Sequence, residues 1–397
     1  MKKTIVFLLM ATTVLLSWNA CRKSESVPRA TVDDSKAMPV LFSSNLQSSI
    51  STRTRGALDQ WSGNEDLYIY GLRRLNGKYV LPTNATNPDD PNAYLIRNVS
   101  AKSPSNVSHG DINVYRVGTE YFYYRDTPYY YNFYAYYVDN AHVPASATAV
   151  TAPQPTENAN TISLKVDIGD NERISKIGGT QDIMLAHTNR VTDAAKGTPS
   201  VDTSRVYGAY AARRGIKPNL IFKHQLARFD FTLKGGTTAA ENDVTVQSLK
   251  VFSKTRGTLV IASNDTLANP RGIFPDTTQD SVALTLQGAA GALPMTGRNC
   301  GSILVMPGEN VYMVELKVKQ NGYTVNGGVI TQYVKINFND IKDSGSGLPA
   351  DAQAVGGHKY NVTMKVYGFE PVKIEVTMAP WEDNHGYFEI DPDENIE

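Results

Sequence analysis

The chain has 397 residues with 39 basic and 39 acidic side chains, so its formal net charge is zero. No basic stripe marks a nucleic-acid interface, and we expect no nucleic-acid partner. The 22 tyrosines, 30 glycines and 20 prolines, with abundant Thr, Val, Asn and Ser, favour strands joined by turns. We therefore expect an all-β protein, and the length suggests two domains.

The first 20 residues have the layout of a secretory signal peptide. Lys2 and Lys3 form a positive start, and the apolar stretch from Thr4 to Leu16 is too short to span a bilayer. Small Ala20 precedes Cys21, which resembles the lipobox of bacterial lipoproteins, although Trp18 and Asn19 stand where a lipobox usually carries Leu and a small residue.

We expect Cys21 to be acylated, which leaves Cys300 as a lone thiol and the mature protein without a disulfide. Acyl chains hold a protein at a membrane surface without a spanning helix. We interpret the polar residues 22–36 as a tether between the lipid and the folded part of the chain. An ordinary secreted protein with a cysteine near the cleavage site is the alternative.

The first strand is expected at residues 39–46, PVLFSSNL. A polar loop follows, which contains Arg53 and Arg55 and ends at Trp61. A second strand, DLYIYGLRR, places Leu67 and Ile69 on one face and tyrosines on the other.

The segment YYYNFYAYYV alternates two aromatic faces, which predicts a strand. Tyr131, Phe133 and Tyr137 share one face, and Tyr134 and Tyr136 share the other. We interpret it as a core strand, because aromatic side chains bury large areas. The alternative is an exposed platform on which sugar rings stack.

The run NLIFKHQLARFDFTL predicts a strand interrupted near His224 to Ala227, and we place a domain boundary just before it. Alternating runs continue to the C-terminus, and the last two are the most regular: Tyr360 to Val366 and Val372 to Met378. The expected fold is two β-sandwich domains of mainly antiparallel strands, covering residues 56–215 and 216–397.

No motif for catalysis, phosphate binding or metal binding is present, so we expect no enzyme, no cofactor and no metal. His224 lies in a strand, where a histidine is usually a structural residue. A glycoside hydrolase whose paired carboxylates come together only in the fold stays open as a further class.

Several segments, in chain order, resemble the fimbrillin family of the Bacteroidetes. The resemblance rests on the lipobox-like Cys21 with its tether, and on VLFSSNL…STRTRGALDQW, YNFYAYYV, LIFKHQLARFDFTL and GHKYNVTMKVYG…VKIEVTMAPWED.

That resemblance implies an adhesive or structural pilus subunit, exported as a lipoprotein to the outer membrane and cell surface. A trypsin-like or gingipain-like protease would cut after Arg55, or after Arg53, and remove residues 21–55 with the lipid and the first strand. The partners would be other fimbrial subunits, which insert a C-terminal strand into the vacated groove. We consider two donor segments, Val372 to Met378 and Tyr387 to Ile390.

The runner-up function is a surface lipoprotein that binds glycans through the tyrosine-rich segment. Within the pilus interpretation, the sequence does not separate shaft, tip and anchor roles.

Overall fold

The computed structural model groups the chain into two units, Met1–Lys36 and Ala37–Glu397. All described residues belong to the second unit. They cover residues 37–46, 61–75, 78–79, 94–107, 109–125, 130–138, 153–158, 160–168, 182–188, 207–263, 270–278, 280–286, 288–340, 353–368 and 372–379.

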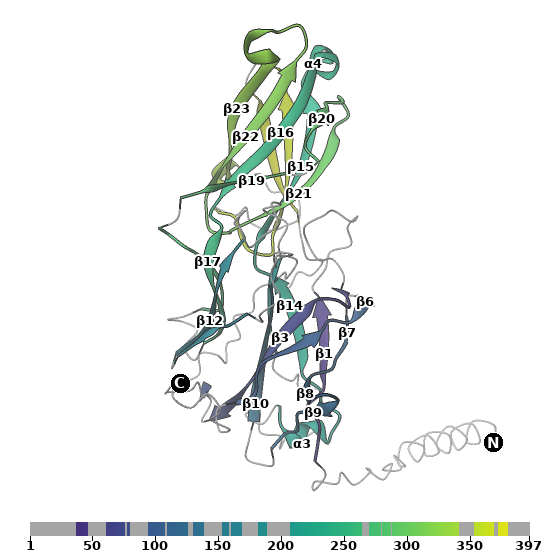
Figure 1. Ribbon diagram of the computed structural model, residues 1–397, viewed down its shortest axis with the longest axis vertical. Coiled ribbons are helices and arrows are strands. Elements are labelled where there is room, and N and C mark those ends of the chain that lie inside the picture. The colour runs from purple at the N-terminus through teal and green to yellow at the C-terminus, as the bar shows by residue number, and fades with distance from the viewer. Residues whose placement is uncertain are drawn as a thin grey trace, which may run out of the picture. The chain divides into compact units, whose positions relative to one another are not determined.

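The largest sheet contains the expected first strand and the aromatic strand (Figure 1). Its order is β4 (Lys78–Tyr79), β3 (Asp66–Leu75), β10 (Tyr130–Val138), β13 (Ile183–Thr188), β14 (Asn219–His224), β1 (Phe42–Leu46) and β7 (His109–Ile112), with β5 (Tyr94–Lys102) also paired to β3. Only the pairing of β1 with β14 is parallel among these strands.

Three further four- and five-stranded sheets complete most of the described fold. One contains β11 (Thr156–Glu157), β12 (Thr161–Asp167), β17 (Arg256–Ser263) and β18 (Gly272–Pro275). The second contains β21 (Arg298–Val305), β15 (Ala227–Gly235), β24 (Lys359–Val366) and β25 (Lys373–Ala379). The third contains β19 (Val282–Thr285), β16 (Val244–Ser253), β22 (Val311–Gln320) and β23 (Val329–Asn337), with β20 (Gly291–Ala292) paired to β16.

Short elements connect these sheets. Two small strand pairs join β2 (Trp61–Ser62) to β6 (Ser105–Val107) and β8 (Tyr115–Val117) to β9 (Glu120–Tyr121). The described helices are α3 (Ala209–Ala212), α4 (Thr238–Asp243) and the 3₁₀ turns η2 (Val325–Gly328) and η3 (Phe338–Asp340). None of these helices has the length and apolarity to cross a membrane.

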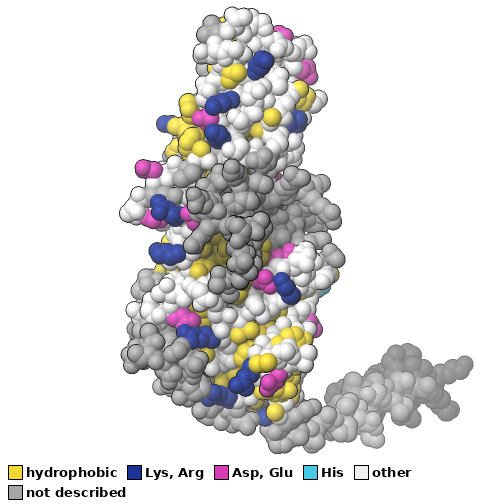
Figure 2. All heavy atoms as spheres, viewed as in Figure 1, with side chains coloured by type: hydrophobic (Ala, Val, Ile, Leu, Met, Phe, Trp, Pro, Cys, Tyr) yellow, Lys and Arg dark blue, Asp and Glu magenta, His cyan; other side chains and the backbone are white. Residues whose placement is uncertain are grey.

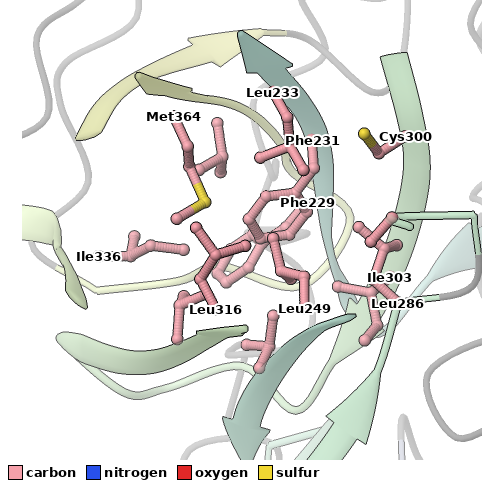
Figure 3. Close-up of a cluster of buried hydrophobic side chains, with 14 of the residues drawn as sticks. Phe229, Phe231, Leu233, Leu249, Leu286, Cys300, Ile303, Leu316, Ile336 and Met364 are labelled. Carbon is pink, nitrogen blue, oxygen red and sulfur yellow. The ribbon is translucent and has the colours of Figure 1, made fainter. Parts of the chain in front are cut away.

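The second and third sheets face each other across a buried core. Phe229, Phe231 and Leu233 project from β15, while Leu249 and Leu316 project from the facing sheet (Figure 3). The β24 residues at alternate positions, Tyr360, Val362, Met364 and Val366, are all fully buried in the same core. The regular alternation of this strand in the sequence therefore correctly predicted a sandwich strand.

The aromatic strand β10 is buried on both faces. Phe133 and Tyr137 belong to one apolar cluster, together with side chains of β1 and β14. Tyr134 and Tyr136 point the other way into a cluster that includes side chains of β12 and β17. The core interpretation of this strand is confirmed, and the alternative of an exposed stacking platform is wrong, because Tyr134 and Tyr136 are only 2% and 0% exposed.

The expected interruption near His224 separates β14 from β15. β14 ends at His224 and β15 begins at Ala227, so the chain leaves one sheet and enters another within two residues. Strand pairing crosses the expected domain boundary at residue 216, because β14 pairs with β1 and β13, and β17 pairs with β12. The boundary itself stays a prediction.

Replacing Tyr136 by alanine tests the core assignment of the aromatic strand. The ring stacks on Tyr68 with centroids 5.2 Å apart, and its hydroxyl donates to Asn98 Oδ1 at 2.7 Å. We expect Tyr136→Ala to lower the free energy of unfolding by about 3 kcal/mol or more, since large aromatic truncations leave a cavity. Chemical denaturation measures the loss.

The matched control for that experiment is Tyr123→Ala, because Tyr123 is 48% exposed. It should change the free energy of unfolding by less than about 0.5 kcal/mol. Equal stabilities for the two variants would contradict the core assignment.

Candidate functional site

The first strand, β1, is an interior strand of the large sheet. It pairs in parallel with β14, with Ser43 opposite Asn219, and antiparallel with β7, with Phe42 opposite Ile112. Both edges of β1 are therefore hydrogen-bonded, and its removal would leave two unpaired strand edges. We call the space that β1 fills between β7 and β14 the β1 slot.

The residues just before β1 are held by a third segment. The amide of Val40 donates to the Phe122 carbonyl at 2.8 Å, and the amide of Tyr124 donates to the Met38 carbonyl at 3.0 Å. Pro39 lies opposite Tyr123 in the same antiparallel bridge. The slot thus extends past β7 along residues 122–124.

Alternate side chains of this segment face inward. Val40, Phe42 and Ser44 are fully buried, and Leu46 is 4% exposed. The Phe42 ring meets the Phe133 ring edge-on, with centroids 4.9 Å apart. Every second side chain of residues 40–46 is therefore enclosed, and its size is limited by the packing around it.

Ser44 occupies the polar position of the slot. Its hydroxyl donates to the Gly110 carbonyl at 3.3 Å. A small hydroxyl side chain satisfies this carbonyl without an unpaired buried group.

Phe133 reaches the slot because its neighbour on β3 has no side chain. Gly71 lies opposite Phe133, and a Cβ at Gly71 would come within 2.8 Å of the Phe133 ring. Around this ring, burial raises the pKa of Tyr207 to about 12 and raises that of Tyr124 further. Both phenols beside the Phe133 ring are therefore neutral at neutral pH.

Arg53 and Arg55 lie outside the described residues, in the segment 47–60, but both ends of that segment are anchored. Leu46 is buried at its start, and Trp61 is fully buried at its end. The Trp61 ring packs edge-on against Phe222 and Tyr137, at centroid distances of 5.2 and 6.2 Å. A cut between the two anchors would divide the chain without removing Trp61 from the core.

Cys21 also lies outside the described residues, so its acylation stays a prediction. Cys300 is a free, buried thiol. Burial raises the pKa of Cys300 above its usual value, which keeps the thiol protonated and poorly nucleophilic.

His224 is a buried partner of a carboxylate. Its Nδ1 lies 2.9 Å from Asp182 Oδ2, and neither side chain is more than 2% exposed. Among the described residues, no group of three or more His, Cys, Asp and Glu side chains could hold a metal ion. The histidine thus joins β14 to the start of β13, which suits a structural role.

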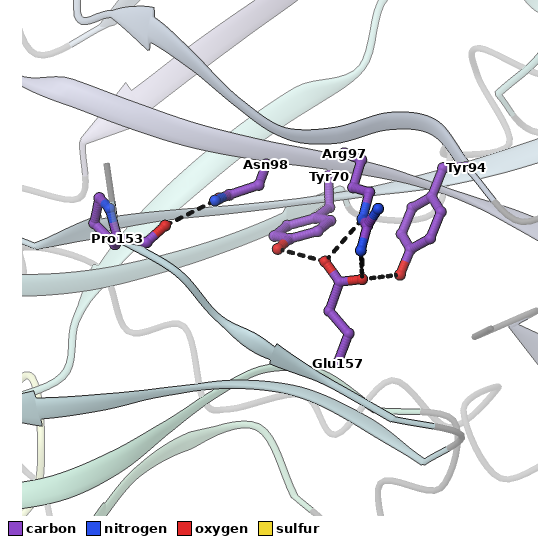
Figure 4. Close-up of polar contacts among 6 residues, drawn as sticks. All are labelled: Tyr70, Tyr94, Arg97, Asn98, Pro153 and Glu157. Carbon is purple, nitrogen blue, oxygen red and sulfur yellow. Dashed lines mark hydrogen bonds and ion pairs between the residues drawn. The ribbon is translucent and has the colours of Figure 1, made fainter. Parts of the chain in front are cut away.

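A second polar cluster centres on Glu157 of β11 (Figure 4). Its carboxylate accepts hydrogen bonds from Tyr70 at 3.0 Å and Tyr94 at 2.8 Å, and forms an ion pair with Arg97 at 2.9 Å. Burial and the nearby carboxylate raise the pKa of Tyr70. Both carboxylate oxygens are occupied, so the cluster ties β11 to the large sheet rather than presenting a free acid.

Of the two expected donor segments, the described residues include the whole of one, Val372 to Met378. β25 pairs antiparallel with β24 at the edge of its sheet, and Ile374 and Val376 are partly buried against the core. The side-chain amide of Gln332 donates to the Gly368 carbonyl and accepts from the Val372 amide, just before β25. The other segment, Tyr387 to Ile390, lies outside the described residues.

The sequence did not reveal the neighbours of the first strand. In β7, Gly110 contacts Ser44 of β1 and lies 66 residues further along the chain. In β14, Asn219 contacts Ser43 of β1 and lies 176 residues further along. Neither β7 nor residues 122–124 has a motif that identifies its partner. The alternation of residues 39–46 indicated an inward face but not what it packs against.

Comparisons with known proteins identify the family of the chain. No functionally curated protein matches the chain. Among solved structures, a candidate cell adhesion protein of Bacteroides uniformis has 16% identity and a TM-score of 0.46, covering 87% of this chain and 99% of that one. A fimbrilin of Porphyromonas gingivalis has 11% identity and a TM-score of 0.45, covering 87% of this chain and 98% of that one.

The tip fimbrial protein Mfa3 of Porphyromonas gingivalis, solved with a C-terminal truncation, is also similar. It has 13% identity and a TM-score of 0.39, covering 86% of this chain and 99% of that one. The sequence pattern of the fimbrillin-like family matches residues 54–381, which is most of the chain. The protein therefore belongs to the fimbrillin-like family.

Proposed function

We propose that this protein is a structural or adhesive subunit of a cell-surface fimbria, without enzymatic activity. In this proposal it is exported as an outer-membrane lipoprotein, cut after Arg55 or Arg53, and polymerised by strand exchange with other fimbrial subunits. Membership of the fimbrillin-like family supports the fimbrial role.

The observation that carries the strand-exchange step is the position of β1. It is an interior strand with three buried inward residues, Phe42, Ser44 and Leu46, and it is paired on both edges. It also precedes the segment with the two arginines. Losing it would expose apolar side chains together with unpaired backbone groups. A strand from another subunit could restore both kinds of contact at once.

The donor in this proposal is a C-terminal strand of a second subunit. β25 is a candidate because it is an edge strand with alternating apolar side chains, held on one side only by β24. It would have to leave β24 and the Gln332 contacts before it could enter a slot. The segment Tyr387 to Ile390 lies outside the described residues, and both segments stay open as donors.

Limited proteolysis tests the proposed activation by cleavage after Arg55 or Arg53. Trypsin treatment of the purified precursor should yield a product that begins at Gly56 and then forms multimers that resist mild denaturant. Arg53→Gln combined with Arg55→Gln should remove both the cut and the multimers, and the two single variants identify which arginine is used. N-terminal sequencing and size-exclusion chromatography give the readouts.

Arg29→Gln is the matched control for the arginine variants, because a cut at Arg29 leaves β1 in place. This variant should behave as the wild type. A precursor that is cut after Arg55 and stays monomeric would count against strand exchange.

A synthetic peptide of residues 37–46 tests the slot directly. After cleavage and removal of the native strand, this peptide should bind saturably and block multimer growth, since it carries the side chains that fit the slot. The same peptide with Phe42→Asp should bind at least about tenfold more weakly, because it places a charge against the Phe133 ring. Equal binding of both peptides would contradict the assignment of the slot.

Lipidation has its own test. Cells that express the wild-type chain should incorporate labelled palmitate into the precursor, and Cys21→Ser should abolish the label because the thioether site is gone. Cys300→Ser is the matched control and should retain the label. Label that persists in Cys21→Ser would show that the lipid assignment is wrong.

A further inference from the structure

The strand β7 is held in the large sheet through β1. Among the described strands, β1 is its only backbone partner, and β7 ends the strand order of the sheet (Figure 1). β14, on the other side of β1, also pairs with β13. Loss of β1 would therefore leave β14 in its sheet but remove the backbone pairing of β7.

A strand that enters the β1 slot needs both of its walls, β7 and β14, at the right separation. Neighbouring strands lie ~4.8 Å apart, so the two walls must stay about twice that distance apart. If β7 moved away, one edge of the incoming strand would stay unpaired, and if β7 closed onto β14, no slot would remain. Contacts that join the two walls without β1 therefore preserve the slot.

Trp61 makes such a contact inside the core. Its ring packs edge-on against Phe222 of β14, with centroids 5.2 Å apart. Its backbone pairs with Val107 of β6, and β7 begins two residues after β6 ends. Trp61 thus connects the two walls, and it stays with the subunit when the chain is cut after Arg55 or Arg53.

The contact of Trp61 with β14 consists of packing. The side chain is fully buried, and no described group accepts a hydrogen bond from its Nε1. Phe222 lies opposite Leu46 in the register of β1 and β14, which places the contact at the end of the slot next to the arginine segment. Another aromatic ring could replace the indole without loss of a hydrogen bond, whereas alanine would remove the contact.

The turn after Trp61 is fixed to the chain that leads into β6 and β7. The Glu65 carboxylate accepts hydrogen bonds from the Ser62 amide at 3.0 Å and the Ser62 hydroxyl at 2.6 Å, and it also accepts from the Ser103 hydroxyl. The Ser103 amide donates to the Glu65 carbonyl at 3.0 Å. Trp61 is therefore tied to this wall by side-chain contacts as well as by strand pairing.

A second contact joins the walls on the exposed side of β1. Lys217, two residues before β14, pairs with Asp111 of β7, with Nζ 2.7 Å from Oδ1. Ser43 of β1 lies opposite Asp111 on one edge and opposite Asn219 on the other, so the ion pair reaches across the strand. The Asp111 side chain is 67% exposed, and exposed ion pairs contribute little to stability, so Trp61 is the stronger of the two contacts.

We propose that Trp61 is a positioning residue that holds the β1 slot open after cleavage, with Lys217 and Asp111 as a second, weaker contact between its walls. The proposal rests on the strand exchange proposed above. Once β1 leaves, Trp61 keeps the segment that leads into β7 against β14, and an incoming strand of another subunit finds both edges in place. A slot that keeps its shape binds more tightly, because less ordering accompanies insertion.

Binding of a labelled peptide of residues 37–46 tests the proposal on full-length protein that has been cleaved and freed of the native strand. Trp61→Ala should weaken the binding about tenfold or more, because β7 is then no longer held against β14. Trp61→Phe should bind within about threefold of the wild type, since its ring restores the packing on Phe222. Fluorescence anisotropy gives the affinities.

Tyr136→Ala is the matched control for loss of stability. It also removes a large buried ring, but from the cluster on the other face of β10. It should bind the peptide within about threefold of the wild type. Equal weakening in Trp61→Ala and Tyr136→Ala would overturn the proposal, because binding would then follow overall stability rather than the slot.

A double-mutant cycle of Lys217→Gln and Asp111→Asn tests the second contact. The peptide has no charged side chain, and Figure 2 shows basic and acidic side chains interspersed on the drawn face rather than a field of one sign. Each single variant should weaken binding about twofold to fivefold, and the double variant should weaken it no further, because all three lose the same ion pair. Single variants that bind like the wild type would overturn the role of the ion pair, and they would overturn the whole proposal if Trp61→Ala does not fold.

The wild-type protein separates this proposal from strand exchange itself. A cleaved wild-type protein that does not bind the peptide would overturn both. Saturable binding by the wild type, with equal binding by Trp61→Ala, would overturn the role of Trp61 and leave strand exchange intact.

Discussion

The edge-on contact between Phe42 and Phe133 joins the first strand to the centre of the large sheet. Phe133 belongs to the aromatic strand, and Gly71 on the neighbouring strand leaves room for its ring. The chain therefore builds this part of its core around a segment that lies before residue 47 and is followed by two arginines. One cut of the backbone after either arginine would separate β1, an interior strand of the sheet, from every other described strand.

The same placement has opposite consequences for stability and for assembly. While β1 is present, both of its edges are paired and its inward side chains are buried. In its absence the same groups would be unpaired and exposed, which favours pairing with any strand of matching pattern.

Whether an aromatic side chain is buried depends on its position in the fold rather than on its residue type. The aromatic side chains of β10 are buried on both faces, because the large sheet is covered on both sides near this strand. Tyr115 and Tyr121 belong to the separate strand pair of β8 and β9, where they pack against each other and stay partly exposed. Hence the tyrosine-rich strand is a core element.

Residue alternation by itself determined the all-β class, the inward faces of the first and last strands, and the interruption after His224, because strand geometry fixes side-chain direction every second residue. Neither the charges nor the motifs in the sequence indicate a catalytic or metal centre. Only the tertiary structure decided that β1 lies between β7 and β14, and that Glu157 gathers Tyr70, Tyr94 and Arg97. These contacts join residues far apart in the chain, and pairing between distant strands depends on the packing of the whole sheet rather than on any local pattern.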